Sequence, residues 1–182
     1  MKRTLTLTAV LLLAASTAFA QATSQGTTTL SLTVGNEANI AITNSTTNLT
    51  TSTTTFSDYT GTTSFKYQVR TSASGSGSIT VLITTDFSAG GSGLPSVKNP
   101  PTAGDALTFT CTAAVGSACS SAQTASTTVA ATAVGFGAGA HAGAPGAITN
   151  GAVGSVLWDL TNDPAYAAGT YTAVATFTIS AT

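Results

Sequence analysis

The sequence predicts an all-β protein: an antiparallel, immunoglobulin-like β-sandwich of about seven to ten strands with Greek-key connections. Three observations favour this fold class. Apolar and polar residues alternate along much of the chain, threonine and β-branched residues are abundant, and glycine-rich turns separate the alternating segments. Threonine and β-branched side chains favour strands, whereas glycine interrupts helices. We therefore expect two antiparallel sheets packed around one core.

The first twenty residues have the features of an export signal. Lys2 and Arg3 precede the apolar run LTLTAVLLLAAS, and Ala18-Phe19-Ala20 forms a small-x-small cleavage site. The apolar run is too short to span a membrane. We expect a mature chain that begins at Gln21 and forms a single domain over residues 21–182. This domain is expected to be secreted to the periplasm or surface of a bacterium, without a membrane anchor.

Charged residues are sparse and predominantly acidic. They make up 6% of the sequence, and the formal net charge of −1 becomes −3 when Lys2 and Arg3 are removed with the signal. A typical soluble domain has about a quarter of its residues charged. Nucleic acids require clustered positive charge on the protein, so we expect no nucleic-acid partner.

The strands are expected in order along the chain. Period-two alternation predicts them in TLSLTV, NIAI, SFKYQVR, SITVLITTDF, LTFTC, VLWDL and GTYTAVATFTISAT. Two long loops rich in glycine and proline are expected near residues 88–105 and 135–152, the second as a flexible excursion or a close-packed Gly/Ala surface. The last strand, with Tyr171, Phe177 and Ile179 on one face, is expected to be central in its sheet because pairing would hold the chain end.

Cys111 and Cys119 are the only cysteines, and export to an oxidising compartment predicts that they form a disulfide. The loop between them is short and contains Gly116, which suits a hairpin or a looped pair of strands. A closed loop of this length stabilises a protein by roughly 2–3 kcal/mol. Free thiols for redox or metal chemistry are the weaker alternative.

No set of residues has the pattern of a catalytic site. His141 is the only histidine, and it lies in a Gly/Ala-rich tract without a nucleophile motif nearby. Asp159 and Asp163 are close in sequence, but the Asn-Asp-Pro at 162–164 is typical of a turn. A calcium site on this loop is a lesser alternative, because carboxylates suit that ion but the EF-hand spacing is missing. We expect no catalytic residue, no metal and no cofactor.

The aromatic residues divide into core and surface candidates. Trp158 alternates in step with Val156 and Leu160, which predicts a core position. Tyr59 and Tyr166 are flanked by polar or turn residues, so they are the candidates for contact with a ligand such as a carbohydrate.

Three segments carry a resemblance to a known group of proteins. The segments TLSLTVGNEANIAI, FKYQVRTSASGSGSITVLI and AGTYTAVATFTISAT cover about a third of the mature chain and resemble subunits of chaperone–usher fimbriae and the related spore-coat-U-like secreted proteins. The resemblance implies an incomplete sandwich whose missing strand comes from the next subunit, and a periplasmic chaperone as an additional partner. Leu30, Leu32 and Val34 would then be the donor residues; the equal alternative is that they form the first strand of their own sandwich.

These observations lead to two functional hypotheses. The first is a secreted or cell-surface structural protein, a fimbrial or coat subunit that assembles with copies of itself or related subunits by strand addition and has no enzymatic activity. The second is a monomeric extracellular binding module or adhesin for a carbohydrate or another surface ligand.

Overall fold

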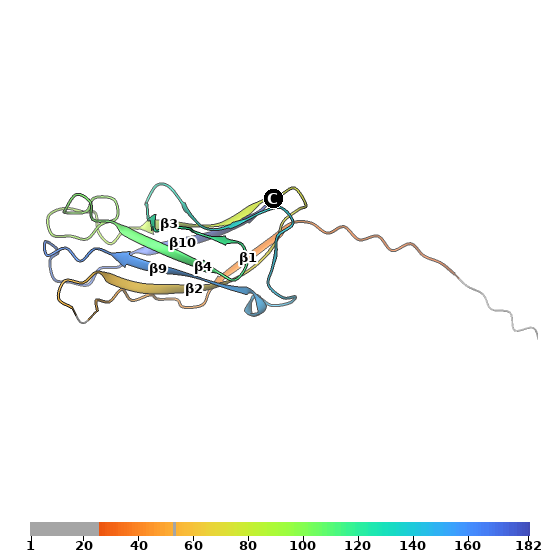
Figure 1. Cartoon of the computed structure of the whole chain (residues 1–182), viewed down its shortest axis with the longest axis horizontal. Coiled ribbons are helices and arrows are strands. Elements are labelled where there is room, and N and C mark those ends of the chain that lie inside the picture. Colours follow the sequence, from red (N-terminus) through yellow and green to blue (C-terminus); the bar gives the residue numbers. More distant parts are fainter. Residues whose placement is uncertain (1–25, 53) are drawn as a thin grey trace, which may run out of the picture. The chain divides into compact units, whose positions relative to one another are not determined.

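The computed structural model describes residues 26–52 and 54–182 (Figure 1). The signal expected over residues 1–20 lies outside the described residues. Residues Val34–Thr182 form a compact unit. Its ten strands and one short 3-10 helix are β1 (Glu37–Ile42), β2 (Tyr59–Arg70), β3 (Gly77–Thr85), β4 (Leu107–Ala113), β5 (Ser117–Ala118), β6 (Gln123–Thr124), β7 (Ala131–Phe136), β8 (His141–Ala142), η1 (Ile148–Asn150), β9 (Ala152–Leu160) and β10 (Val174–Ala181).

The strands form two antiparallel sheets. The first sheet has the order β1-β2-β9-β4-β6, and β8 also pairs with β2. The second sheet has the order β10-β3-β7-β5. The predicted all-β, two-layer antiparallel sandwich is therefore confirmed, while its immunoglobulin-like type and Greek-key connections stay predictions.

The core lies between the sheets and follows the alternation of the sequence. In β3, in β9 and in β2 from Thr63 onward, buried side chains alternate with side chains that face outward. This is the pattern expected where one face of a strand packs and the other meets water. The largest fully buried side chains are Tyr67, Phe65, Phe109, Ile79, Ile83, Val81, Val134 and Val156.

Tyr67 is the one fully buried phenol among the described residues, and its hydroxyl is paired twice. The hydroxyl donates to the Val115 carbonyl at 2.5 Å and accepts from the Val115 amide at 2.9 Å. Burial raises the pKa of Tyr67 above its ordinary value, and the bond to the Val115 backbone partly offsets this. The bonds tie β2 to the loop that follows β4.

The last strand is not central in its sheet. β10 lies at the edge of the second sheet, where it pairs with β3 from Val174 to Ala181. Its inward residues, which include Phe177 and Ile179, are only half-buried. The sequence prediction was wrong here because alternation reports which face of a strand is apolar and carries no signal for a missing neighbour.

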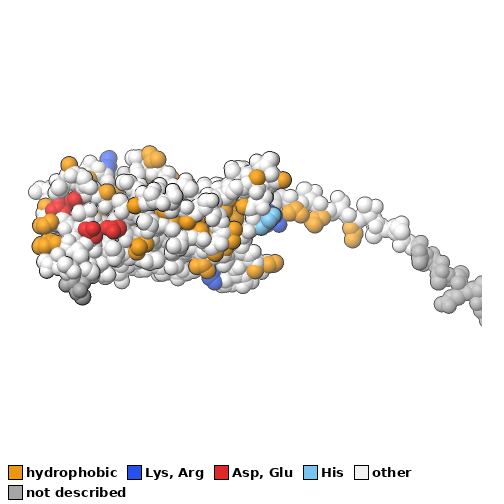
Figure 2. Space-filling view, in the orientation of Figure 1, with side chains coloured by type: hydrophobic (Ala, Val, Ile, Leu, Met, Phe, Trp, Pro, Cys, Tyr) orange, Lys and Arg blue, Asp and Glu red, His pale blue; other side chains and the backbone are white. Residues whose placement is uncertain are grey.

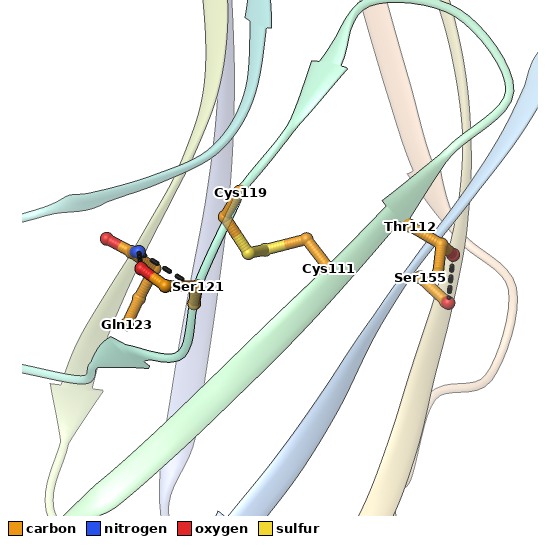
Figure 3. The surroundings of a disulfide bond; sticks show 6 residues. All are labelled: Cys111, Thr112, Cys119, Ser121, Gln123 and Ser155. Carbon is orange, nitrogen blue, oxygen red and sulfur yellow. Dashed lines mark hydrogen bonds between the residues drawn. A yellow bond between two sulfur atoms is a disulfide. The ribbon is translucent and has the colours of Figure 1, made fainter.

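The predicted disulfide is confirmed. Cys111 lies in β4 of the first sheet, and Cys119 directly follows β5 of the second sheet (Figure 3). Their Cα atoms are 5.4 Å apart. The Cys119 amide also donates to the Ala133 carbonyl of β7 at 3.0 Å. The bond therefore links the two sheets on the side opposite β1 and β10.

The two predicted loops differ in structure. Residues 88–105 contain turns and bends without a strand, whereas the stretch 135–152 contains the end of β7, β8 and η1. Ala142 of β8 is buried, and the Ala144 amide donates to the Asn150 carbonyl at 2.9 Å. This second tract thus has packed and hydrogen-bonded parts.

Residues 26–33 form the described part of a separate unit and lie in no strand. The alternating segment TLSLTV is therefore not a strand in this structure, and the first strand is β1. The exposed fractions of Leu30 and Leu32 are 91% and 85%, and that of Val34 is 57%. We call residues 26–34 the arm. Within the described residues, no helix is long and apolar enough to cross a membrane.

Candidate functional site

A groove of about 980 Å³ opens along the side of the sandwich where β1 and β10 are the edge strands. This volume is at the upper end of the range for ligand sites. One wall begins at Ile42 and continues through residues 44–49, and the other wall is formed by residues 166–177. The floor is apolar and belongs to the core; it includes Ile83, Leu107, Trp158, Leu160 and Phe177.

Trp158 is the central residue of the floor. Its ring packs edge-on against Phe109, with ring centres 5.4 Å apart, and against Phe177, with ring centres 6.5 Å apart. The Trp158 indole Nε1 donates to Thr63 Oγ1 at 2.8 Å. The predicted core position of Trp158 is confirmed, with 4% of the residue exposed, although it also lines the groove.

Hydroxyl and amide groups hold the first wall against β2. Thr47 Oγ1 lies 2.6 Å from Thr63 Oγ1, and Asn44 Nδ2 donates to Thr47 Oγ1 at 2.9 Å. Asn44 Oδ1 accepts from the Ser64 amide at 2.7 Å. The hydroxyl-rich tract of the sequence thus forms a wall anchored by its polar side chains, and Leu49 packs against the core.

The second wall is held by the loops at the same end of the sandwich. The Ala167 amide donates to the Gly93 carbonyl at 2.7 Å, and the Tyr171 hydroxyl donates to the Ala167 carbonyl at 3.0 Å. The Tyr166 hydroxyl lies 3.3 Å from Asp105 Oδ2. Burial and the carboxylate of Asp105 raise the pKa of Tyr166 to about 12, so the phenol is a hydrogen-bond donor at neutral pH.

Four aspartates lie at this end of the sandwich, and we call Asp58, Asp105, Asp159 and Asp163 the acidic rim. Of these, Asp163 lines the groove, and Asp105 and Asp58 bond to the groove residues Tyr166 and Asn162. Asp163 Oδ2 accepts from Thr102 Oγ1, and Asp163 Oδ1 accepts from the Ala165 amide at 2.8 Å. These bonds lower the pKa of Asp163. They also agree with the turn predicted at residues 162–164.

The carboxylates of the rim act on one another. Burial, together with the facing carboxyl of Asp163, raises the pKa of Asp105. Burial and the charge of Asp58 raise the pKa of Asp159. Mutual repulsion at this end of the sandwich therefore favours a positively charged neighbour.

The structure brings together some of the residues singled out in the sequence and separates others. Tyr59 and Tyr166 line the same groove. His141 is exposed in β8 and pairs with Arg70 at the far end of β2. No group of three or more His, Cys, Asp or Glu residues suited to a metal ion occurs in residues 26–52 and 54–182.

The sequence reasoning missed the groove itself. One wall depends on Asn44 and Thr47, which lie in a hydroxyl-rich tract without a clear pattern, and on Thr63, which is far from them in the sequence. One signal was present: Ala175 of the last strand and Ala173 just before it are small residues at half-buried positions, where large side chains would fill a closed core. They leave space beside Phe177.

No protein-family model, curated protein or solved structure matches the chain. The groove, the exposed arm and the distribution of charge are therefore the features of this chain that bear on its function.

Proposed function

We propose that the chain is an exported structural subunit without enzymatic activity, whose groove receives the arm of another copy as an added strand. One observation carries this proposal: Trp158 and Phe177 belong to the core and yet line an open groove beside an edge strand. The disulfide between Cys111 and Cys119 is compatible with an oxidising, extracytoplasmic compartment.

The edge of β10 has the chemistry that a further strand requires. β10 pairs only with β3 among the described strands, so the backbone groups of its other edge have no strand partner there. An exposed edge of this kind is a template for an extended segment, whose backbone pairs with the edge while alternate side chains fill the groove.

The arm has the complementary pattern. Leu30, Leu32 and Val34 alternate with Ser31 and Thr33, so a strand built from them has one apolar face and one hydroxyl face. Burial of three such side chains contributes roughly 5–9 kcal/mol before the cost of ordering the arm.

The direction of the added strand follows from the positions of the groove and the arm. The arm joins the domain just before Glu37, which pairs with Arg70 at the end of β2, whereas the groove opens where β2 begins. The C-terminal end of the arm is joined to its own domain, which stays outside the groove of the neighbour. An arm that enters from the groove mouth therefore has its C-terminal end at the mouth. It runs antiparallel to β10 because β10 begins at the mouth end, where Val174 pairs with Thr85.

Two small residues, Ala175 of β10 and Ala173 just before it, set the register of this added strand. Leu30 is placed opposite Phe177, and Leu32 is placed opposite Ala175. Val34 then lies opposite Ala173, nearest the mouth. In this register Leu32 and Val34 of the arm each lie opposite an alanine.

Two arm variants test the proposal. The mature chain with Leu30→Asp and Leu32→Asp is expected to remain monomeric in light scattering with size-exclusion chromatography, because two carboxylates cannot enter an apolar groove. The matched control, Ser31→Asp with Thr33→Asp, adds the same charge on the other face and should still associate. Equal association of the two variants, or a wild-type chain that stays monomeric at high concentration, would contradict strand addition.

A binding module is the second candidate, and one observation favours it. Tyr59 and Tyr166 line the same groove, with polar groups of the rim beside them, and this combination suits a carbohydrate. A glycan array with the L30D/L32D variant, whose groove has no arm to fill it, tests this function. Binding that is lost in a Tyr59→Ala, Tyr166→Ala variant would support it, and an array without signal would exclude the sugars tested.

A further inference from the structure

The charged side chains of the domain lie mainly at its two ends. The acidic rim, with Asp86 directly after β3, stands at the end where β2 begins and the groove opens. Arg70 stands at the opposite end of β2. Figure 2 shows acidic side chains gathered near one end of the domain, with the histidine and a basic side chain near the other.

The acidic rim lacks basic partners among the described residues. In residues 26–52 and 54–182 the only ion pair joins Arg70 to Glu37, so no rim carboxylate has a basic group within 4.0 Å there. Lys98 is the basic residue at this end, and its backbone amide donates to Asp86 Oδ2 at 3.0 Å. Asp159 makes no side-chain hydrogen bond to the described residues and faces outward from β9.

The opposite end carries the root of the arm. Arg70 Nε donates to the Gly35 carbonyl at 2.8 Å, and an Arg70 terminal nitrogen lies 2.9 Å from a carboxylate oxygen of Glu37. His141 pairs with Arg70 across the sheet. Lys66, on the same outward face of β2, donates to the Thr149 carbonyl at 2.5 Å. We call Gly35, Glu37, Lys66, Arg70 and His141 the arm root.

The length of the arm brings these two ends together, and this step rests on the proposed function. When Val34 lies opposite Ala173 in a neighbour's groove, only Gly35 and Asn36 separate it from Glu37 of its own domain. Three residues span at most about 10 Å. The arm root of the donor copy must then lie against the mouth of the groove in the acceptor copy.

We propose that the groove mouth is a docking surface for a second copy of this chain, in which the acidic rim of the acceptor binds Arg70 and Lys66 at the arm root of the donor. Lys66 and Arg70 outnumber Glu37, the carboxylate that pairs with Arg70, so the arm root has a net positive charge opposite the negative rim. Rim against rim or root against root would repel. Charge thus fixes a head-to-tail order, and the arm supplies the apolar burial. Each copy has both ends, so the contact repeats along a fibre.

Charge reversal in the full mature chain tests this contact. Arg70→Glu and Asp159→Lys, each alone, are expected to weaken association about fivefold to tenfold, measured by sedimentation at about 50 mM NaCl. The double variant has an acid at the root and a base at the rim, so association should return toward the wild-type value. Association of the wild-type chain should weaken between about 50 and about 500 mM NaCl because salt screens the pairs.

Lys98→Glu is the matched control, because it makes the same charge change as Arg70→Glu but at the acidic end. Association of the Lys98→Glu variant should not be weakened. Thermal melts of each variant identify any that is unfolded, and Lys66→Glu replaces Arg70→Glu in that case. Wild-type association that is unaffected by salt or by either single reversal overturns the docking contact and leaves strand addition intact. A monomeric wild-type chain overturns both.

Discussion

Asp86 and Asp105 show how similar residues come to have opposite effects on stability. Burial alone would raise the pKa of Asp86, but the backbone amides of Val97, Lys98 and Phe87 and the Ser96 hydroxyl outweigh burial and lower it. Burial and the facing carboxyl of Asp163 instead raise the pKa of Asp105. The first carboxylate therefore stabilises the fold when ionised, whereas ionisation of the second has a cost.

Asparagine at each position separates these effects. Asp86→Asn should lower the melting temperature at neutral pH, because the ionised Asp86 with its lowered pKa stabilises the fold above pH 3.8. This contribution is lost as the pH falls through the folded-state pKa.

Asp105→Asn should raise the melting temperature at neutral pH because it removes the repulsion from Asp163 and keeps an acceptor for Tyr166. Its gain should vanish as the pH falls through the raised pKa toward 3.8. Melts from neutral pH down to about pH 3 measure both, and equal shifts of the same sign would contradict this assignment.

Thr63 is a single residue on which the groove floor and one wall both depend. Thr63→Val keeps the shape of the side chain but leaves the Trp158 Nε1 proton without its acceptor and removes the bond between the Thr47 and Thr63 hydroxyls. We expect a loss of about 1–3 kcal/mol in the free energy of unfolding. Urea unfolding followed by the fluorescence of the one tryptophan measures this loss, with exposed Thr62→Val as the control. A loss as small as that of the control would show that the hydrogen bond does not matter.

At the scale of elements, the two lateral sides of the sandwich are closed differently. The disulfide joins β4 to the segment after β5 on one side, while β1 and β10 flank the groove on the other. Replacement of Cys111 and Cys119 by alanine should lower the free energy of unfolding by about 2–3 kcal/mol, since the closed loop is short. Urea unfolding at low protein concentration measures the change. A loss below about 0.5 kcal/mol, as for a surface substitution, would contradict a structural role for the bond.

Alternation along the sequence located parts of the long strands, but it also predicted a strand in TLSLTV, where there is none, and it did not find the short or irregular strands. β2, β3 and β9 are long and have regular period-two burial, so the pattern was sufficient. In β7 both Ala133 and Val134 are buried, and its pairing with β3 shifts between Ile79 and Thr80. An irregularity of this kind breaks the period and conceals the strand.

The site was less predictable than the fold. The aromatic candidates Tyr59 and Tyr166 did come from the sequence, but the groove that contains them depends on which strands lie at the sheet edges. Neighbours in a sheet are set by long-range pairing, for which one sequence without relatives carries little signal. For the same reason the edge position of β10 could not be inferred from its alternation.

At the scale of the whole molecule, the domain combines an open groove, an exposed apolar arm and charges placed at opposite ends. Each feature by itself is a liability, because free strand edges and exposed leucines favour aggregation. Together they suit an ordered assembly, in which the arm covers the edge of the next copy and the charges set the direction. Few ionisable groups are then needed elsewhere on the surface.

A cysteine crosslink between two copies tests strand addition most directly. Leu32→Cys in one mature chain and Ala175→Cys in another place the new thiols opposite each other when the arm of the first lies in the groove of the second. Strand addition predicts a disulfide-linked heterodimer on mixing under mild oxidation, and little or none when Thr33→Cys replaces Leu32→Cys. A mixture that gives no more linked heterodimer than the Thr33→Cys control would contradict strand addition. A chain that carries both Leu32→Cys and Ala175→Cys and closes on itself as a crosslinked monomer would contradict it as well.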